Sequence, residues 1–185
     1  MNDYFGAHMS IAGGIHLAPE RGVKVGCAVI QVFTQNSNQW RGKPVSDYDA
    51  LLFKEKWCES GLQEIVSHDI YLVNLAAAPG ETREKSLTAF REEMERCSRL
   101  GITKIIMHPG AHLGDGEETG IKRICEAFNV AQTPYERNCL LQFVNHLSLE
   151  CPKKKCPLVT SSIRSSLQST PLQIYNNVEL QLQVR

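Results

Sequence analysis

Four short apolar segments alternate with four helical patterns along this chain. The run at residues 28–33 is rich in β-branched side chains, as expected of a strand buried on both faces. Further strands are expected at residues 4–10, 64–66 and 104–107, and helices at 15–25, from about 46, around 87–97 and at 117–131. This alternation predicts an α/β fold with a parallel sheet and helical crossovers. Four such units are about half of an eightfold barrel of ~250 residues, so a truncated half barrel is expected.

The helix from about residue 46 has a recognisable start. Ser46 and Asp49 have the spacing of a capping box, in which a serine side chain accepts a backbone N–H three residues later. Leu51, Leu52 and Trp57 are expected to form the apolar side of this helix. The sequence therefore predicts both the first turn of the helix and the face that it buries.

The next helix has the clearest periodicity. Phe90, Met94 and Cys97 recur at helical spacing, with the charged residues 91–93 between them. Gly101 follows where a C-terminal cap belongs. After residue 133 the alternation weakens, although residues 139–144 fit a fifth strand.

Two histidines follow strands at equivalent places. His68 follows the apolar run at 64–66 after one serine, and His108 comes directly after the run at 104–107. In parallel barrels the chemistry lies at the carboxyl ends of the strands, so the two imidazoles are expected at one mouth. Neutral imidazole is a common zinc ligand, which makes them candidate ligands of one metal ion. The alternative is that each histidine closes its strand by hydrogen-bonding a loop.

Further candidates surround this pair. Asp69 either accepts a hydrogen bond from the His68 ring and so orients it, or is an ordinary loop acid. His8 lies at a strand end, and His112 lies in a glycine-rich loop from which it either reaches the same mouth or faces solvent. Aromatic side chains after strands either insert into a nucleic acid or pack their own loop, and this applies to Tyr71 and Trp40.

Composition limits the partners. The formal net charge is +0, so any nucleic-acid surface must be local. No apolar run approaches the ~20 residues of a membrane helix, and no signal peptide is visible, so an intracellular place in the cytoplasm, nucleoid or nucleus is expected. The chain has seven cysteines, an odd number that favours reduced thiols over a disulfide framework. Composition does not indicate an oligomeric state.

The last part of the chain differs in composition. Beyond Glu136 the only carboxylates are Glu150 and Glu179 and the only histidine is His146. A three-lysine run at 153–155 either contacts phosphates or is simply solvated. The pair of cysteines at 151 and 156 is a weak zinc signal without a second pair nearby. Residues 1–132 are therefore expected to form the barrel part and residues 133–185 a divergent tail.

Five strings of this sequence resemble one family in order and spacing. They are residues 6–14, 33–40, 68–75, 84–86 and 108–113. They are similar to endonuclease IV, the zinc-dependent apurinic/apyrimidinic endonuclease family, over residues 4 to about 132. The string His-Asp-Ile-Tyr-Leu-Val-Asn-Leu at 68–75 is the most specific of the five.

The resemblance implies a TIM barrel with three zinc ions, acting in base excision repair on double-stranded DNA with abasic sites. The reaction would be hydrolysis of the phosphodiester on the 5′ side of the abasic nucleotide. By this match His68 and His108 would bind one zinc, shared with a bridging glutamate, and Tyr71 would push into the duplex. The loop from Gln35 to Trp40 would approach the DNA, with Asn38 where the family commonly has an arginine.

The remaining family ligands are not found in the sequence. The family carries its bridging glutamate in a Glu-Asn-Thr-Ala-Gly string, and this chain reads Phe-Val-Asn-His-Leu at 143–147 instead. Later Cys-x-Asp-Thr-Cys-His and His-x-Asn-Asp strings are also absent. A reading-frame change near Tyr135 would produce this pattern. Three readings follow: an abasic-site endonuclease by lineage, a truncated inactive remnant with at most a weak single-metal site, or a sugar isomerase-like metal-dependent barrel.

Overall fold

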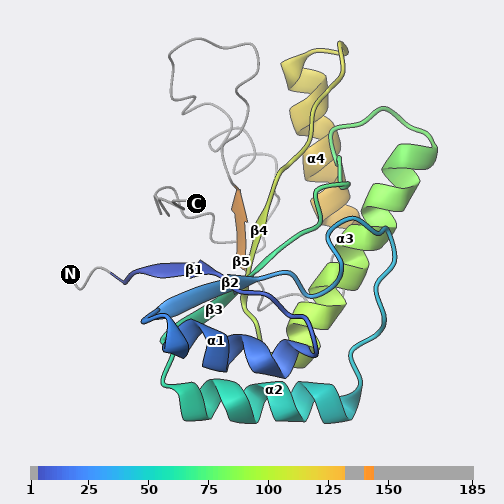
Figure 1. Ribbon diagram of the computed structural model, residues 1–185. Coiled ribbons are helices and arrows are strands. Elements are labelled where there is room, and N and C mark those ends of the chain that lie inside the picture. The colour runs from blue at the N-terminus through green and yellow to red at the C-terminus, as the bar shows by residue number, and fades with distance from the viewer. Residues whose placement is uncertain (1–3, 132–139, 144–185) are drawn as a thin grey trace.

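The structure, a computed structural model, describes residues 4–131 and 140–143. Its strands are β1 (Gly6–His8), β2 (Val29–Val32), β3 (Glu64–His68), β4 (Lys104–Met107) and β5 (Leu140–Phe143). They form one parallel sheet in the order β1-β2-β3-β4-β5, which is also their order along the chain (Figure 1). Sequential order with parallel pairing is the arrangement of consecutive barrel strands. The expected α/β half barrel is confirmed, and its fifth strand lies where the sequence suggested.

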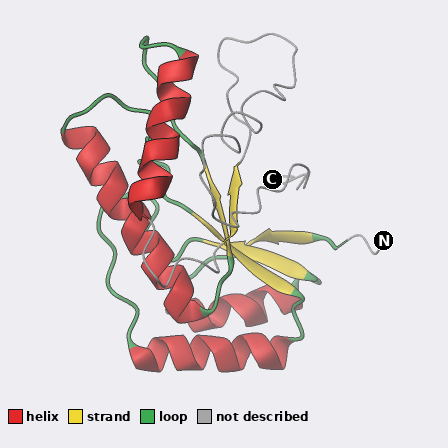
Figure 2. Ribbon diagram, turned by 180° about the vertical axis from the view of Figure 1, so that it is seen from behind, coloured by secondary structure: helices red, strands yellow, loops and turns green. Residues whose placement is uncertain are grey.

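Helices follow the first four strands. They are the short 3-10 helix η1 (Ile15–Leu17) and the α-helices α1 (Ala18–Lys24), α2 (Asp47–Ser60), α3 (Glu81–Leu100) and α4 (Glu117–Ala131). Figure 2 shows these helices wrapped around one side of the fanned sheet. Each helix lies between two parallel strands in the sequence, as a crossover connection requires.

The capping prediction for α2 is confirmed, whereas its predicted buried face is wrong in part. The Ser46 hydroxyl accepts a hydrogen bond from the Asp49 backbone N–H at 3.0 Å. Leu51, however, is 59% exposed. Ala50 and Phe53 are the residues of α2 that are buried, because three-residue spacing places them on the side that packs against the other helices. The other two predicted residues of this face are half-buried.

The core lies between the sheet and the helices. Phe90, Met94 and Cys97 of α3 are buried there, and Gly101 caps the helix with a left-handed φ of 78°. Ile65 of β3 is fully buried in the same cluster. Burying one such side chain stabilises the fold by about 1.5–3 kcal/mol, so this layer supplies the main driving force. The periodicity of α3 is confirmed, together with its cap.

Several predictions fall partly or wholly outside the described residues. These are the boundary of the tail at residue 133, the lysine run and the cysteine pair of the tail. In the described part, Cys27, Cys58, Cys97 and Cys125 are free thiols. Among the helices of that same part, none has the length and apolar character needed to cross a bilayer.

Candidate functional site

His68 and His108 lie side by side at the carboxyl ends of neighbouring strands. In the β3–β4 register, His68 is paired with Ile106. Alternate residues of a strand share a face, so His108, two residues further, points to the same side as His68. Their ring centroids are 5.2 Å apart. The parallel register thus brings together two side chains that are 40 residues apart in the sequence.

The imidazole of His68 is held with one nitrogen free. Its Nδ1 lies 2.6 Å from the carbonyl oxygen of Asp69 and donates to it in the neutral tautomer that this contact selects. The side chain is buried, and burial lowers the pKa of His68, with His108 and His8 adding to this effect. A neutral ring with its Nε2 lone pair available is the form that binds a metal ion.

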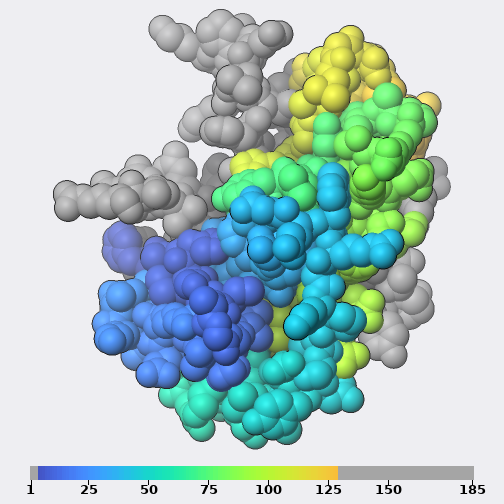
Figure 3. Space-filling view, turned by 45° about the vertical axis from the view of Figure 1, so that its right-hand side comes forward, coloured from blue at the N-terminus to red at the C-terminus, as the bar shows by residue number. Residues whose placement is uncertain are grey.

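An aromatic cluster surrounds the two histidines. The ring of Phe33, directly after β2, lies 4.5 Å from His8, 5.3 Å from His68 and 5.4 Å from Tyr71. Tyr71 lies 5.3 Å from His68 and 5.8 Å from His108, and its side chain is 60% exposed. The segments that follow β2 and β3 form a continuous surface at this end (Figure 3). Tyr71 is therefore an exposed ring immediately beside the histidine pair.

Phe33 is a member of this site that the sequence argument did not single out. It was part of a matched string but was given no role. Its position directly after β2 is equivalent to that of His108 after β4, and this was the available signal. Its ring contacts both His8 and His68, so it links His8 to the histidine pair.

The three predicted neighbours of the pair have different surroundings. His8 contacts Gln31 through Nδ1, at 2.9 Å from the amide oxygen. His112 accepts backbone N–H groups from Gly114 at 3.2 Å and Gly116 at 3.1 Å, so its Nδ1 orders its own loop. Asp69 contacts His68 through its backbone carbonyl and not through its carboxylate. It is through this carbonyl that Asp69 serves as an acceptor for the histidine.

The Asp69 carboxyl group is itself unusual. It is 1% exposed, and its Oδ1 accepts the Ile70 backbone N–H at 2.8 Å. Its Oδ2 has no hydrogen-bond partner within the described residues. Burial raises the pKa of Asp69 to about 8, and the negative charge of Glu93 adds to the rise. The carboxyl group is therefore largely protonated at neutral pH.

The loop predicted to approach DNA turns two of its three named side chains inward. Gln35 is 6% exposed and packs against Gly42, while Trp40 is half-buried against the core. Asn38 is exposed, and its backbone N–H is held by the Asn36 side chain at 3.0 Å. In this arrangement Asn38 is the named residue of the loop that faces solvent.

A buried polar network lies directly behind the site. Glu93 of α3 is fully buried, although its place among the charged residues of α3 suggested an exposed side chain. Its carboxylate accepts hydrogen bonds from Ser67, from Thr34 at 2.5 Å and from Arg96 at 2.9 Å. Glu93 lies three residues after Phe90 and four before Cys97, and this spacing was a signal of burial. The network joins α3 to the ends of β2 and β3.

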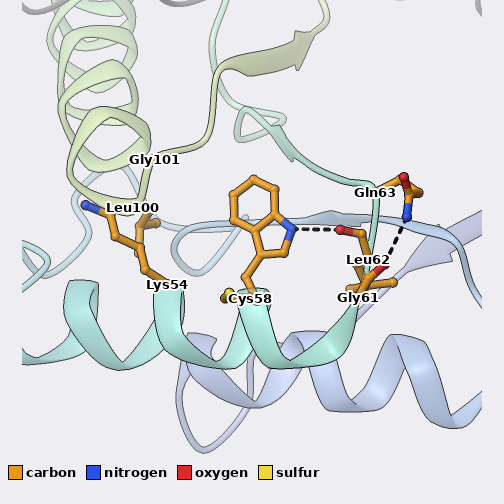
Figure 4. A pocket seen from close by; sticks show the side chains of 8 residues that line it. Lys54, Cys58, Gly61, Leu62, Gln63, Leu100 and Gly101 are labelled. Atoms are coloured by element: carbon orange, nitrogen blue, oxygen red, sulfur yellow. Dashed lines mark hydrogen bonds between the residues drawn. The ribbon is translucent and has the colours of Figure 1, made fainter.

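The pocket drawn in Figure 4 is distant from these residues. It is lined by the last turns of α2 and α3 and by the segments that lead into the next strands, including Lys54, Cys58, Leu62 and Leu100. Trp57 donates from its indole N–H to the Leu62 carbonyl at 3.2 Å within it. The pocket lies at the amino-terminal end of β3 and therefore opposite the histidines. It brings together no cluster of ionisable side chains that would support catalysis.

The described residues do not complete a zinc site. Among residues 4–131 and 140–143, no group of three or more His, Cys, Asp or Glu side chains is placed to hold a metal ion. A structural or catalytic zinc usually takes three or four protein ligands. The two imidazoles therefore supply part of a ligand set, and the described part of the chain does not fit a complete metal centre.

Comparisons with known proteins place these features in a family. The family model described as "Xylose isomerase-like TIM barrel" matches residues 19–137, more than half of the chain. A relative named "Probable endonuclease 4" from Geobacter sulfurreducens is 77% identical over 129 residues, which are 70% of this chain and 44% of the relative. One of the same name from Geotalea daltonii is 70% identical over 145 residues, which are 77% of this chain and 51% of that protein. This chain thus spans about half the length of these relatives.

Solved structures agree on the architecture. Endonuclease IV from Thermus thermophilus superposes with a TM-score of 0.72 at 27% identity, covering 93% of this chain and 61% of that one. A D-psicose 3-epimerase superposes with a TM-score of 0.64 at 12% identity, which shows a shared fold alone. With the family model, the relatives and the strand-end histidines in agreement, this chain belongs to the endonuclease IV family of TIM-barrel proteins.

Proposed function

We propose that this chain derives from a zinc-dependent apurinic/apyrimidinic endonuclease of base excision repair, which hydrolyses the phosphodiester on the 5′ side of an abasic nucleotide. The observation that carries the proposal is the pairing of His68 with His108 at adjacent strand ends, with the exposed Tyr71 beside them. Relatives with 70–77% identity that are named as endonucleases support the same reading.

The chain's own residues have distinct proposed roles. His68 and His108 supply imidazole nitrogens toward one zinc ion, and the Asp69 carbonyl fixes the His68 ring. Tyr71 enters the duplex at the lesion because its ring is exposed and rests on the histidine pair. Asn38 contacts DNA from the neighbouring loop. Since the net charge is +0, this contact depends on local fit more than on general attraction to phosphates.

The proposal for the isolated chain is that it does not incise DNA. Within residues 4–131 and 140–143, the two histidines fall short of the ligand set of one zinc, and far short of three. Association of two copies would not help, because both copies lack the same family strings. We propose that the chain holds at most one zinc ion, weakly, and recognises abasic DNA without cleaving it.

Two measurements on the purified chain test these statements. The first is zinc content per chain, with the expected result of at most one ion, lost when His68 is changed to alanine. The second is incubation with a duplex containing one abasic site, with and without chelator, where no incision is expected. Chelator-sensitive incision, or about three zinc ions per chain, would refute the inactive reading. Equal binding of abasic and intact duplexes would count against the DNA-repair lineage.

A sugar isomerase-like activity is the second candidate. The fold it requires is present, since a D-psicose 3-epimerase shares the architecture. At 12% identity that likeness says nothing of chemistry, whereas the 77% identical relative is named as an endonuclease. An assay with ketose sugars and added divalent metal is expected to show no turnover.

A further inference from the structure

We propose that Asn74 is the positioning residue of this site, holding the loop that carries His108 against the loop that follows His68. The proposal rests on the proposed function only for the statement that the two histidines act as ligands. The hydrogen bonds and contacts from which it is argued all join residues of this chain. It can therefore be tested without metal and without DNA.

The need for such a residue follows from where the strand pairing ends. A backbone hydrogen bond from the Asp69 N–H to the Ile106 carbonyl at 2.8 Å extends the pairing of β3 with β4 as far as Asp69. His108 lies beyond that point, at the start of a glycine-containing loop. A ligand on such a loop has its position set by whatever holds the loop.

Asn74 makes that connection with its side-chain amide. Its Nδ2 donates to the Ala111 carbonyl at 3.0 Å, and its Oδ1 accepts the Ala111 N–H at 3.0 Å. Oδ1 also accepts the Ala76 N–H at 3.1 Å. The amide thus pairs with both polar groups of one residue across 37 positions of sequence, as a neighbouring strand would. The two loops are joined three residues beyond His108.

Gly110 makes the close approach possible. Its φ is +100°, a left-handed value that favours glycine. A Cβ at this position would overlap the Oδ1 of Asn74. The asparagine is therefore seated against bare backbone two residues after His108. The glycine, its left-handed backbone and the lack of room for a Cβ are all consistent with the close contact between Gly110 and Asn74.

Asn74 is itself fixed to the helical layer. Its backbone N–H donates to the hydroxyl of Ser86 in α3 at 3.0 Å. Arg83 of α3 donates to the Leu75 carbonyl at 2.5 Å, and Arg123 of α4 donates to the carbonyl of the following residue at 3.2 Å. Two helices therefore hold the segment from which Asn74 reaches out. A residue anchored in this way can set the position of a second loop.

The direct test is Asn74→Asp in the metal-free full chain. The substitution keeps the oxygen that accepts the Ala111 N–H but removes the Nδ2 donor and places a carboxylate oxygen toward the Ala111 carbonyl. The readout is the set of proton NMR cross-peaks among aromatic rings. We expect cross-peaks of His108 with His68 and Tyr71 to be lost, while those between His8 and Phe33 remain. A general loss of structure would remove both sets.

The matched control is Asn36→Asp. Asn36 also accepts a backbone N–H through its side chain, but from Asn38 in its own loop. The same chemical change there is expected to leave all His108 cross-peaks in place. Gly110→Ala places a Cβ against the Asn74 amide and so disrupts the same contact from the other loop. It is expected to cause the same loss of His108 cross-peaks as Asn74→Asp. Unchanged His108 cross-peaks in folded Asn74→Asp would overturn the proposal.

A second measurement needs no variant. Ala111 is exposed, so its amide would exchange rapidly with solvent unless Asn74 protects it. Exchange at least about tenfold slower than in an unstructured peptide is expected, and exchange at the unstructured rate would also overturn the proposal. Titration with zinc alone then separates the two claims. If zinc does not bind but the NMR and exchange results hold, the proposed function fails while the role of Asn74 stands.

Discussion

The residues buried near the two ends of the sheet differ in polarity. Behind the carboxyl ends of β2 and β3, the buried groups include Thr34, Ser67 and the ion pair of Glu93 with Arg96. Toward the amino-terminal ends, the buried residues are apolar, among them Leu100 and Ile102. One helix, α3, contributes to both regions. Apolar packing thus extends to both ends of the fold, since Ile70, Val73 and Leu75 after β3 are also buried, whereas the buried polar groups gather at the end where the histidines lie.

This difference shows how the fold supports its site. A buried ion pair seldom adds stability over an apolar replacement, because removing both charges from water is costly. Apolar packing is non-directional, whereas hydrogen bonds fix orientation. We interpret the Glu93 network as a device that orients the strand ends, with Ser67 directly preceding His68.

The largest effect is expected from Glu93→Gln. This substitution keeps the shape of the side chain but removes the shorter, fully buried ion pair of Arg96, at 2.9 Å, and leaves only the longer one to Glu92 at 3.8 Å. Breaking a buried pair in this way costs about 3–5 kcal/mol in the free energy of unfolding. The measurement is unfolding in denaturant, with Glu95→Gln on the exposed side of α3 as the control. A loss below about 1 kcal/mol would show that the network contributes little.

A comparable but smaller loss is expected from Leu100→Ala at the other end of α3. Leu100 is fully buried, and removing such a side chain costs about 2–5 kcal/mol. The distinguishing readout is the NMR cross-peak between His68 and His108 below the unfolding temperature. We expect it to persist in Leu100→Ala and to weaken in Glu93→Gln. The same response in both variants would contradict the division between the two ends.

A moderate, pH-dependent effect on the free energy of unfolding is expected from Asp69→Asn. Burial raises the pKa of Asp69 from 3.8 to about 8, so the folded state holds a proton that the unfolded state releases. The stability that this proton confers is complete below about pH 4 and is lost as the pH rises to about 8. Asparagine cannot ionise, so the variant should lose that part of the pH dependence of unfolding. Asp47→Asn, on the surface, should keep it, and a wild-type slope in Asp69→Asn would exclude this role.

The smallest effect on stability is expected from Tyr71→Ala. The side chain is 60% exposed, so the free energy of unfolding should change by no more than about 0.5 kcal/mol. Affinity for an abasic duplex should fall nonetheless, because stacking of an aromatic ring on a base is worth about 1–3 kcal/mol. Tyr71→Phe keeps the ring and is expected to bind nearly as well. Unchanged binding by the alanine variant would remove Tyr71 from the proposed DNA contact.

How much of the structure could be predicted from the sequence depended on how far apart the interacting residues are in the chain. The strands and the cap at Ser46 were predictable because they depend on neighbouring residues. The pairing of His68 with His108 was also predictable, since parallel strands place equivalent positions together. The contact between Asn74 and Ala111 was not, because it spans 37 residues and follows no period. The burial of Glu93 was signalled by its spacing from Phe90, but its charge pointed the other way.

We propose that residues 4–131 hold the first half of an endonuclease site, whose remaining ligands are absent from the described residues. The most direct measurement is incision of an abasic duplex by a chimera in which residues 1–131 are joined to the second half of the Geobacter sulfurreducens relative. We predict chelator-sensitive incision that His68→Ala abolishes, and none by the 185-residue chain alone. A folded chimera without incision, or incision by the chain alone, would contradict the claim.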